Sequence, residues 1–100
     1  MLLASGQIAT SATPTPLSST PLQPKKWVMK ALSSNAGQVG IGPASQPSGA
    51  ALSMANAHLM DPGDDLAVDR TIQQGTVYDV TPADVYVVGN GGVVTWLAFG

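Results

Sequence analysis

Residues 84–99 constrain the fold more than any other part of the chain. Two runs of β-branched and aromatic residues flank the sequence Gly89-Asn90-Gly91-Gly92. Val, Tyr, Thr and Trp favour strands, and Asn-Gly supplies the positive φ angles that a tight two-residue turn requires. The spacing therefore predicts an antiparallel hairpin that closes the domain and provides a wall of apolar side chains.

Further short runs with strand character precede this stretch, and turn signals separate them. Asp61-Pro62-Gly63-Asp64 is a predicted turn, because Pro sets φ at the second position and Gly accepts the positive φ of the third. Strands at intervals of ~8–12 residues with turns between them are typical of a sandwich or small barrel. We therefore predict an all-β fold, a small antiparallel β-sandwich or barrel. The remaining strands are expected at residues 25–33, 38–42, 66–69 and 76–80.

Residues 50–60 are ambiguous between helix and strand. Their Ala, Leu and Met residues favour a helix, Ser48 is a possible N-cap, and Pro62 would end the helix. Propensity alone indicates a short helix. We nevertheless expect a short strand followed by a turn, for the family reason given below.

Residues 1–24 differ in composition from the rest of the chain and are dominated by Ser, Thr and Pro. Such a segment buries too little apolar area to offset its ordering entropy, and it favours extended backbone. We expect an extended N-terminal arm at residues 1–24 and a β-sandwich domain at residues 25–100; a disordered leader is the alternative. Isolated apolar side chains are the expected anchors of the arm on a partner: Leu2, Leu3, Ile8, Leu17 and Leu22.

The folded part is small, and the chain has no cysteine with which to form disulfides. A core of this size rarely supplies more than ~3–5 kcal/mol, so we expect a homo-oligomer or docking on a larger body. Only four Lys and Arg residues are present, which argues against nucleic-acid binding. The start has neither the basic region of a signal peptide nor a long apolar run, so no membrane contact is expected.

Two further sets of residues are candidates for contacts with partners. Lys25 and Lys26, with Lys30, form a basic patch at the base of the arm. This patch either binds an acidic surface or protects an edge strand. The aromatic residues are expected in the core and at a subunit interface, and a sugar-stacking platform is the less favoured alternative. The interface candidates are Trp27, Tyr86, Trp96 and Phe99.

The sequence offers little for catalysis or metal binding. The Asp residues between 61 and 69 do not follow the alternating oxygen-ligand pattern of a calcium loop. His58 is the only histidine, and no Gly-x-Ser-x-Gly elbow accompanies it. The Gly-rich stretch at residues 89–92 lacks the Lys-Ser/Thr of a phosphate-binding loop. We expect no enzyme activity, no metal and no cofactor.

From Trp27 onward the chain resembles a family of small β-sandwich proteins in the virions of tailed bacteriophages. The resemblance rests on strand and turn residues and covers about three-quarters of the chain. Its parts are Trp27-Val28-Met29-Lys30-Ala31-Leu32, Asn35-Ala36-Gly37-Gln38-Val39-Gly40-Ile41-Gly42, Leu52-Ser53 with Asn56, Met60-Asp61-Pro62-Gly63-Asp64-Asp65-Leu66, Asp84-Val85-Tyr86-Val87-Val88-Gly89 and Val93-Val94-Thr95-Trp96-Leu97.

The resemblance implies a structural function. Similar proteins are capsid decoration (cement) proteins, commonly trimeric. We therefore expect a homotrimer that binds the assembled major capsid protein on the outer surface of the virion, after synthesis in the host cytoplasm. The arm would lie over neighbouring capsomers. The alternative is a head or tail fibre, or a receptor-binding module of the virion that recognises glycans.

Overall fold

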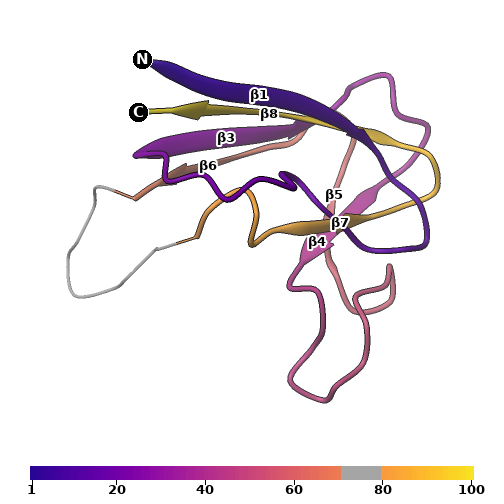
Figure 1. Cartoon of the computed structure of the whole chain (residues 1–100). Coiled ribbons are helices and arrows are strands. Elements are labelled where there is room, and N and C mark those ends of the chain that lie inside the picture. The colour runs from indigo at the N-terminus through magenta and orange to yellow at the C-terminus, as the bar shows by residue number, and fades with distance from the viewer. Residues whose placement is uncertain (71–79) are drawn as a thin grey trace.

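The computed structural model is an all-β sandwich, and it describes residues 1–70 and 80–100. The strands form two antiparallel sheets of four, sheet A in the order β1-β8-β3-β6 and sheet B in the order β2-β7-β4-β5. Figure 1 shows the two layers, with both termini at the same end of sheet A. The predicted β-sandwich is thus confirmed. The strands are β1 (Leu2–Ala9), β2 (Thr15–Pro16), β3 (Lys26–Ala31), β4 (Val39–Gly42), β5 (His58–Met60), β6 (Asp65–Asp69), β7 (Tyr86–Val88) and β8 (Val93–Phe99).

The core lies between the two sheets and follows from the alternation of side chains along each strand. In β8 and β3, every second residue is buried, and the residues between them face outward. Trp27 is fully enclosed, and its Nε1 donates a hydrogen bond to Val80 O at 2.7 Å. The buried cluster consists of Leu17, Trp27, Met29, Ala31, Val39, Ile41, Met60, Val87, Val94, Trp96 and Ala98.

Residues 1–24 do not form an arm outside the domain, so the predicted boundary at residue 24 is wrong. β1 pairs with β8 from Leu2 to Ala9, with one register shift between Leu2 and Ala4, and β2 pairs with β7 in the other sheet. Leu17 belongs to the buried core, and Ile8 and Leu22 pack against it. The physical reason is that a chain poor in apolar residues is ordered here by backbone pairing to a strand that is already apolar.

The predicted hairpin at residues 84–99 is also wrong, although both of its runs are strands. β7 belongs to sheet B and β8 to sheet A, so the chain crosses between the layers at residues 89–92. Neighbouring segments take up the backbone groups of this crossing. Gly89 N donates to Ser11 O at 2.9 Å, and Thr10 N donates to Gly92 O at 2.7 Å. These bonds attach the crossing to the end of β1.

The other predictions of secondary structure have mixed outcomes. β3, β4, β6 and the turn at residues 61–64 are confirmed, with Gly63 at φ +91°. Residues 50–60 contain no helix; an isolated bridge joins Ala51 to Ser45, and a turn follows in which Asn56 N donates to Ser53 O at 3.1 Å. The strand β5 was missed. The strand expected at residues 76–80 lies, apart from Val80, outside the described residues.

Because Leu17 is core, its truncation tests whether the N-terminal segment is part of the domain. We expect Leu17→Ala to lower the free energy of unfolding by ~2–5 kcal/mol, the usual cost of a cavity left by a buried leucine. Leu2→Ala, at an exposed position, is the matched control and is expected to change it by less than ~0.5 kcal/mol. Urea unfolding followed by circular dichroism measures both. Equal effects would show that residues 1–24 do not contribute to the core.

Candidate functional site

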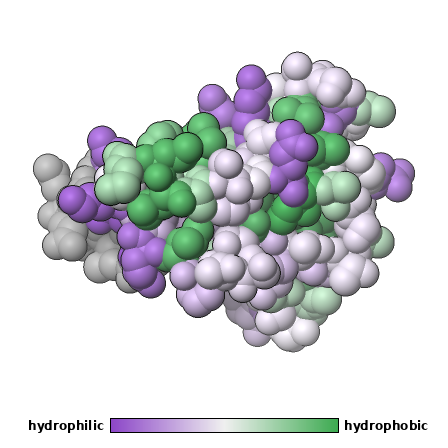
Figure 2. Space-filling view, turned by 45° about the horizontal axis from the view of Figure 1, so that its top comes forward, coloured by the Kyte–Doolittle hydropathy of each residue, from purple (hydrophilic) through white to green (hydrophobic). Residues whose placement is uncertain are grey.

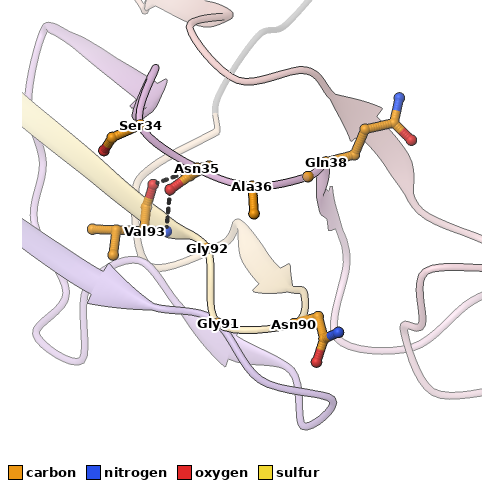
Figure 3. Close-up of a pocket in the computed structure, with 9 residues that line it drawn as sticks. Ser34, Asn35, Ala36, Gln38, Asn90, Gly91, Gly92 and Val93 are labelled. Atoms are coloured by element: carbon orange, nitrogen blue, oxygen red, sulfur yellow. Dashed lines mark hydrogen bonds between the residues drawn. The ribbon is translucent and has the colours of Figure 1, made fainter.

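A hollow of about 440 Å³ lies where two loops of the described chain meet (Figure 3). It lies between residues 34–38 and the crossing at residues 90–93. The Asn35 side chain spans these segments: Nδ2 donates to Val93 O at 3.0 Å, and Oδ1 accepts from Val93 N at 2.9 Å. Gln38 turns away to donate to Asp61 Oδ1 at 2.8 Å. No titratable side chain lines the hollow, so its polar groups hold the crossing and offer no acid or base.

Elsewhere, the described residues form no cluster of metal-binding or catalytic side chains. Within residues 1–70 and 80–100, no group of three or more His, Cys, Asp and Glu is placed to hold a metal ion. His58 is exposed in β5. In the same part of the chain, the search for a helix long and apolar enough to cross a membrane finds none.

The best candidate for a binding surface is the outer face of sheet A. Directly opposite residues of an antiparallel pair share a face, so the register identifies its members. Its apolar part, which we call the outer patch, consists of Leu2 in β1, Leu97 and Phe99 in β8, Val28 in β3 and Ala67 in β6. Figure 2 shows hydrophobic side chains over the end of the molecule where the termini lie, bordered by hydrophilic ones.

Small side chains leave two shallow hollows in the outer patch. A hollow of about 300 Å³ lies between Val28, Ala67 and Phe99, and its lining is almost wholly apolar. A second hollow, of about 170 Å³, lies on the other side of Val28, beside Leu97. Shallow apolar hollows that flank a ridge are suited to receive side chains of a partner surface.

Charged pairs on β3 and β6 border the outer patch. Lys26 Nζ lies 3.7 Å from Asp69 Oδ2, and Lys30 stands opposite Asp65 in register. Exposed ion pairs of this kind contribute little to stability. They place both signs of charge at the rim, where they can orient a partner without repelling it.

The described residues cover the outer face of sheet B but not that of sheet A. On sheet B, a Cβ added to Gly40 would lie within 2.6 Å of Ala57 Cβ, and one added to Gly42 within 2.8 Å of Leu52 Cδ1. Residues 43–57 therefore pack over that face, and Leu52 is buried beneath them. The outer patch of sheet A has no such cover among the described residues, and Leu97 and Phe99 are 41% and 36% exposed.

The structure brings together some of the predicted site residues and separates the others. Leu2, Phe99 and Lys26 lie side by side on three neighbouring strands, and Lys25 N donates to Phe99 O at 2.8 Å. Leu3 is exposed and lies against Gly100. The remaining candidates face elsewhere: Ile8, Leu17, Leu22, Trp27 and Trp96 lie in or against the core, and Tyr86 is half-buried in β7 of sheet B, opposite Gly42 and Pro16.

Sequence reasoning missed Val28, Leu97 and Ala67, although strand alternation contained the signal. Trp96 and Phe99 differ by an odd number of positions, so they point to opposite faces of one strand. Leu97 shares the face of Phe99, and Val28 stands opposite Leu97. The prediction grouped the aromatic residues by type and ignored which face of the strand each one occupies, so the residues of the outer patch were not recognised as one surface.

The aromatic residues do not form an exposed platform for sugar stacking among the described residues. Trp27 and Trp96 are 1% and 7% exposed. Phe99 is the one predicted aromatic on the outer patch, and Tyr86 belongs to the other sheet. Tyr78 lies outside the described residues.

Comparison with family models, with curated proteins and with solved structures finds no match for this chain. The resemblance to virion β-sandwiches therefore remains a prediction from the sequence.

Asn35 and Asn90 border the same hollow and allow a matched comparison. Asn35→Ala removes both hydrogen bonds to Val93 and leaves the Val93 N–H without this acceptor, while Val93 O keeps its bond from Leu32 N at 3.1 Å. We therefore expect a loss of ~1–3 kcal/mol in the free energy of unfolding. Asn90→Ala, at an exposed position with no hydrogen bond of its side chain among the described residues, is expected to change it by less than ~0.5 kcal/mol. Thermal unfolding of the two variants side by side checks this. A neutral Asn35→Ala would mean that the crossing is held by other contacts.

Proposed function

We propose that this chain is a structural protein of a bacteriophage virion, a decoration protein that binds the assembled major capsid protein and stabilises the shell. It acts as a homotrimer, without enzymatic chemistry, on the outer capsid surface after synthesis in the host cytoplasm. The observation that carries the proposal is the outer patch, an apolar sheet face that the described residues leave open, whereas residues 43–57 cover the outer face of the other sheet.

A sheet face suits this function better than a pocket does. A decoration protein needs surface burial on a broad neighbour, and the outer patch offers exposed aliphatic and aromatic side chains on adjacent strands. Burial of apolar area contributes roughly 25 cal/mol per Å², so even modest coverage of the patch would matter. Its hollows beside Val28 give shape that a partner can match.

The arm mechanism inferred from composition is replaced in this proposal. Ile8, Leu17 and Leu22 pack in or against the core, so they are not free to anchor on capsomers. Leu2 remains available, because it lies on the outer patch next to Phe99. The contact to the shell or to a second subunit is therefore assigned to a face of the folded domain. Trimeric assembly, which the resemblance implies, would multiply weak contacts by avidity.

A charge placed at the centre of the outer patch tests this assignment. We expect Leu97→Lys to lower the occupancy of this protein on purified capsids of the encoding phage at least tenfold, because a buried ammonium would have to be desolvated. Occupancy is measured by re-adding each variant to capsids stripped of the protein and quantifying the bound fraction after sedimentation.

Leu59→Lys is the matched control for this experiment. Leu59 is 40% exposed, close to the 41% of Leu97, but it lies in β5 of sheet B. Both variants should unfold at wild-type denaturant concentrations, and Leu59→Lys should bind normally. Full occupancy of Leu97→Lys, or absence of the chain from purified virions, would refute the proposed function.

A further inference from the structure

Among the described residues, β1 is the least protected sheet edge. Each sheet ends in two edge strands, and three of the four are protected in recognised ways. β2 has two residues, one of them Pro16, β5 has three residues, and β6 carries Asp65 and Asp69. β1 has eight residues and contains neither a charge nor a proline, and its one register shift, between Leu2 and Ala4, lies at its start, so that residues 4–9 form a regular edge. Such an edge presents a row of backbone donors and acceptors to any strand that approaches.

The register shows which backbone groups face outward. Thr10, next to the end of β1, donates its N–H to Gly92 O. In an antiparallel ladder, residues bonded to the neighbouring strand alternate with residues whose N–H and C=O point away from it. Counted back from Thr10, the outward groups include those of Ser5, Gln7 and Ala9, and within the described part of the chain no backbone partner is found on that side.

A hollow of about 350 Å³ lies directly beside this edge. Residues 4–7 of β1 form one wall, residues 17–20 with Leu22 form the other, and Trp96 also lines it. In the wall opposite β1, Ser18 Oγ donates to Thr20 O at 2.7 Å and accepts from Thr20 N at 3.2 Å, so this hydroxyl is already bonded within the wall. The hollow is thus open to receive the side chains of an added strand.

The Trp96 indole presents an unused donor to the hollow. Trp96 is 93% buried, since its exposed fraction is 7%. Trp27 Nε1 bonds to Val80 O, whereas Trp96 Nε1 has no hydrogen-bond partner among the described residues. No fully buried side-chain nitrogen or oxygen of those residues lacks a partner, so Trp96 Nε1 reaches solvent. It lies 2.7 Å from the position of a Cβ on Gly6, immediately beneath β1.

We propose that the β1 edge and this hollow bind an extended, uncharged segment of another polypeptide as an added antiparallel strand. The residue of that segment opposite Gly6 carries a short hydroxyl or amide side chain, Ser, Thr or Asn. Directly opposite residues share a face, so this side chain enters the hollow and accepts the hydrogen bond of Trp96 Nε1. The outward groups of Ser5, Gln7 and Ala9 bond to the backbone of the segment.

A second copy of this chain fits the site less well. Two β1 edges related by a two-fold axis would pair antiparallel. In such a pair, a residue whose backbone N–H and C=O bond to β8 can stand only opposite another residue of the same kind. The β1 residues able to stand opposite Gly6 would then be Ala4, Gly6 and Ile8 of the other copy, because the register shift between Leu2 and Ala4 turns Leu2 to the outer face; none of the three carries an acceptor in its side chain. Trp96 would remain unpaired, which favours a different polypeptide.

The chemistry of the surroundings indicates an uncharged segment. The first charged residue of the chain is Lys25, so β1 and residues 17–22 offer no partner for a charge. Leu17 and Leu22 line the hollow, and an ionised side chain placed there would lose hydration without compensation. A short hydroxyl or amide loses less and gains the indole N–H.

A displayed peptide library tests the proposal on the full chain. A yeast-displayed library of random nine-residue peptides is sorted against the labelled protein. We expect enrichment of uncharged, strand-forming peptides with Ser, Thr or Asn at one fixed position. A synthetic peptide of an enriched sequence should shift the Trp96 indole N–H signal in a ¹⁵N spectrum. This signal is assigned by its loss in the variant Trp96→Phe. The peptide should also slow hydrogen exchange of the Ser5 and Gln7 backbone amides.

Two variants with matched controls separate the backbone from the indole. Gln7→Pro removes an outward N–H without touching the β1–β8 bonds and should weaken peptide binding at least tenfold, whereas Gln7→Ala should bind normally. Trp96→Phe should bind but lose the preference for Ser, Thr or Asn over Ala at the fixed position. Circular dichroism and thermal unfolding confirm that each variant is folded.

Three results would overturn the inference: no enrichment, equal binding by Gln7→Pro, or a wild-type dimer that Gln7→Pro dissociates in sedimentation experiments. The site requires only a partner polypeptide and does not rest on the proposed virion function. Leu97→Lys leaves the β1 edge intact and should bind the selected peptides normally. A failure of capsid binding and a failure of strand addition are therefore distinguishable.

Discussion

The contact between Trp96 and Gly6 governs the arrangement of sheet A. Trp96 projects inward from β8, and its indole extends beneath the neighbouring β1. Any Cβ at position 6 would come within 2.7 Å of Nε1 and 3.0 Å of Cε2, so only glycine lets β1 approach β8 at ladder distance there. β8 can then pair on both sides, with β1 and with β3, and it becomes an interior strand. One missing side chain thus admits the N-terminal segment into the fold.

The fold class was predictable, but the connections between strands were not. Strand alternation and turn residues are local properties, and β3, β4, β6, β7 and β8 all carry them. Whether two consecutive strands remain in one sheet depends on which groups the linking residues meet. At residues 89–92 those groups belong to Thr10, Ser11 and Asn35, two segments distant in the sequence. The Asn-Gly signal describes a compact turn equally well in a hairpin and in a crossing between layers.

The N-terminal segment shows why composition misleads for strands that complete a sheet. Ser, Thr, Ala and Gly bury little apolar area, so composition alone predicts disorder. β1 takes its stability from backbone bonds to β8 and from the apolar surface that β8 provides, with only Ile8 and Ala4 packing against the core. The outer patch was hidden for a related reason. Its residues are unremarkable singly, and only the pairing of β8 with both β1 and β3 sets Leu2, Leu97 and Val28 on one surface.

The unpaired indole of Trp96 bears on selectivity more than on affinity. In the free protein Nε1 reaches solvent, so replacing water by a fixed acceptor yields a net gain of only ~0.5–1.5 kcal/mol. Filling of the hollow by side chains would supply part of the binding free energy. Backbone bonds along β1 would supply most of the rest, and these bonds do not depend on the sequence of the added strand. The indole does depend on it, because only one residue of that strand stands opposite Gly6. A strand shifted by two residues would keep its backbone hydrogen bonds to β1. It would lose the bond to Trp96 Nε1 unless the shift placed another suitable side chain opposite Gly6. Trp96 would therefore set the register of binding, while the uncharged edge sets its strength.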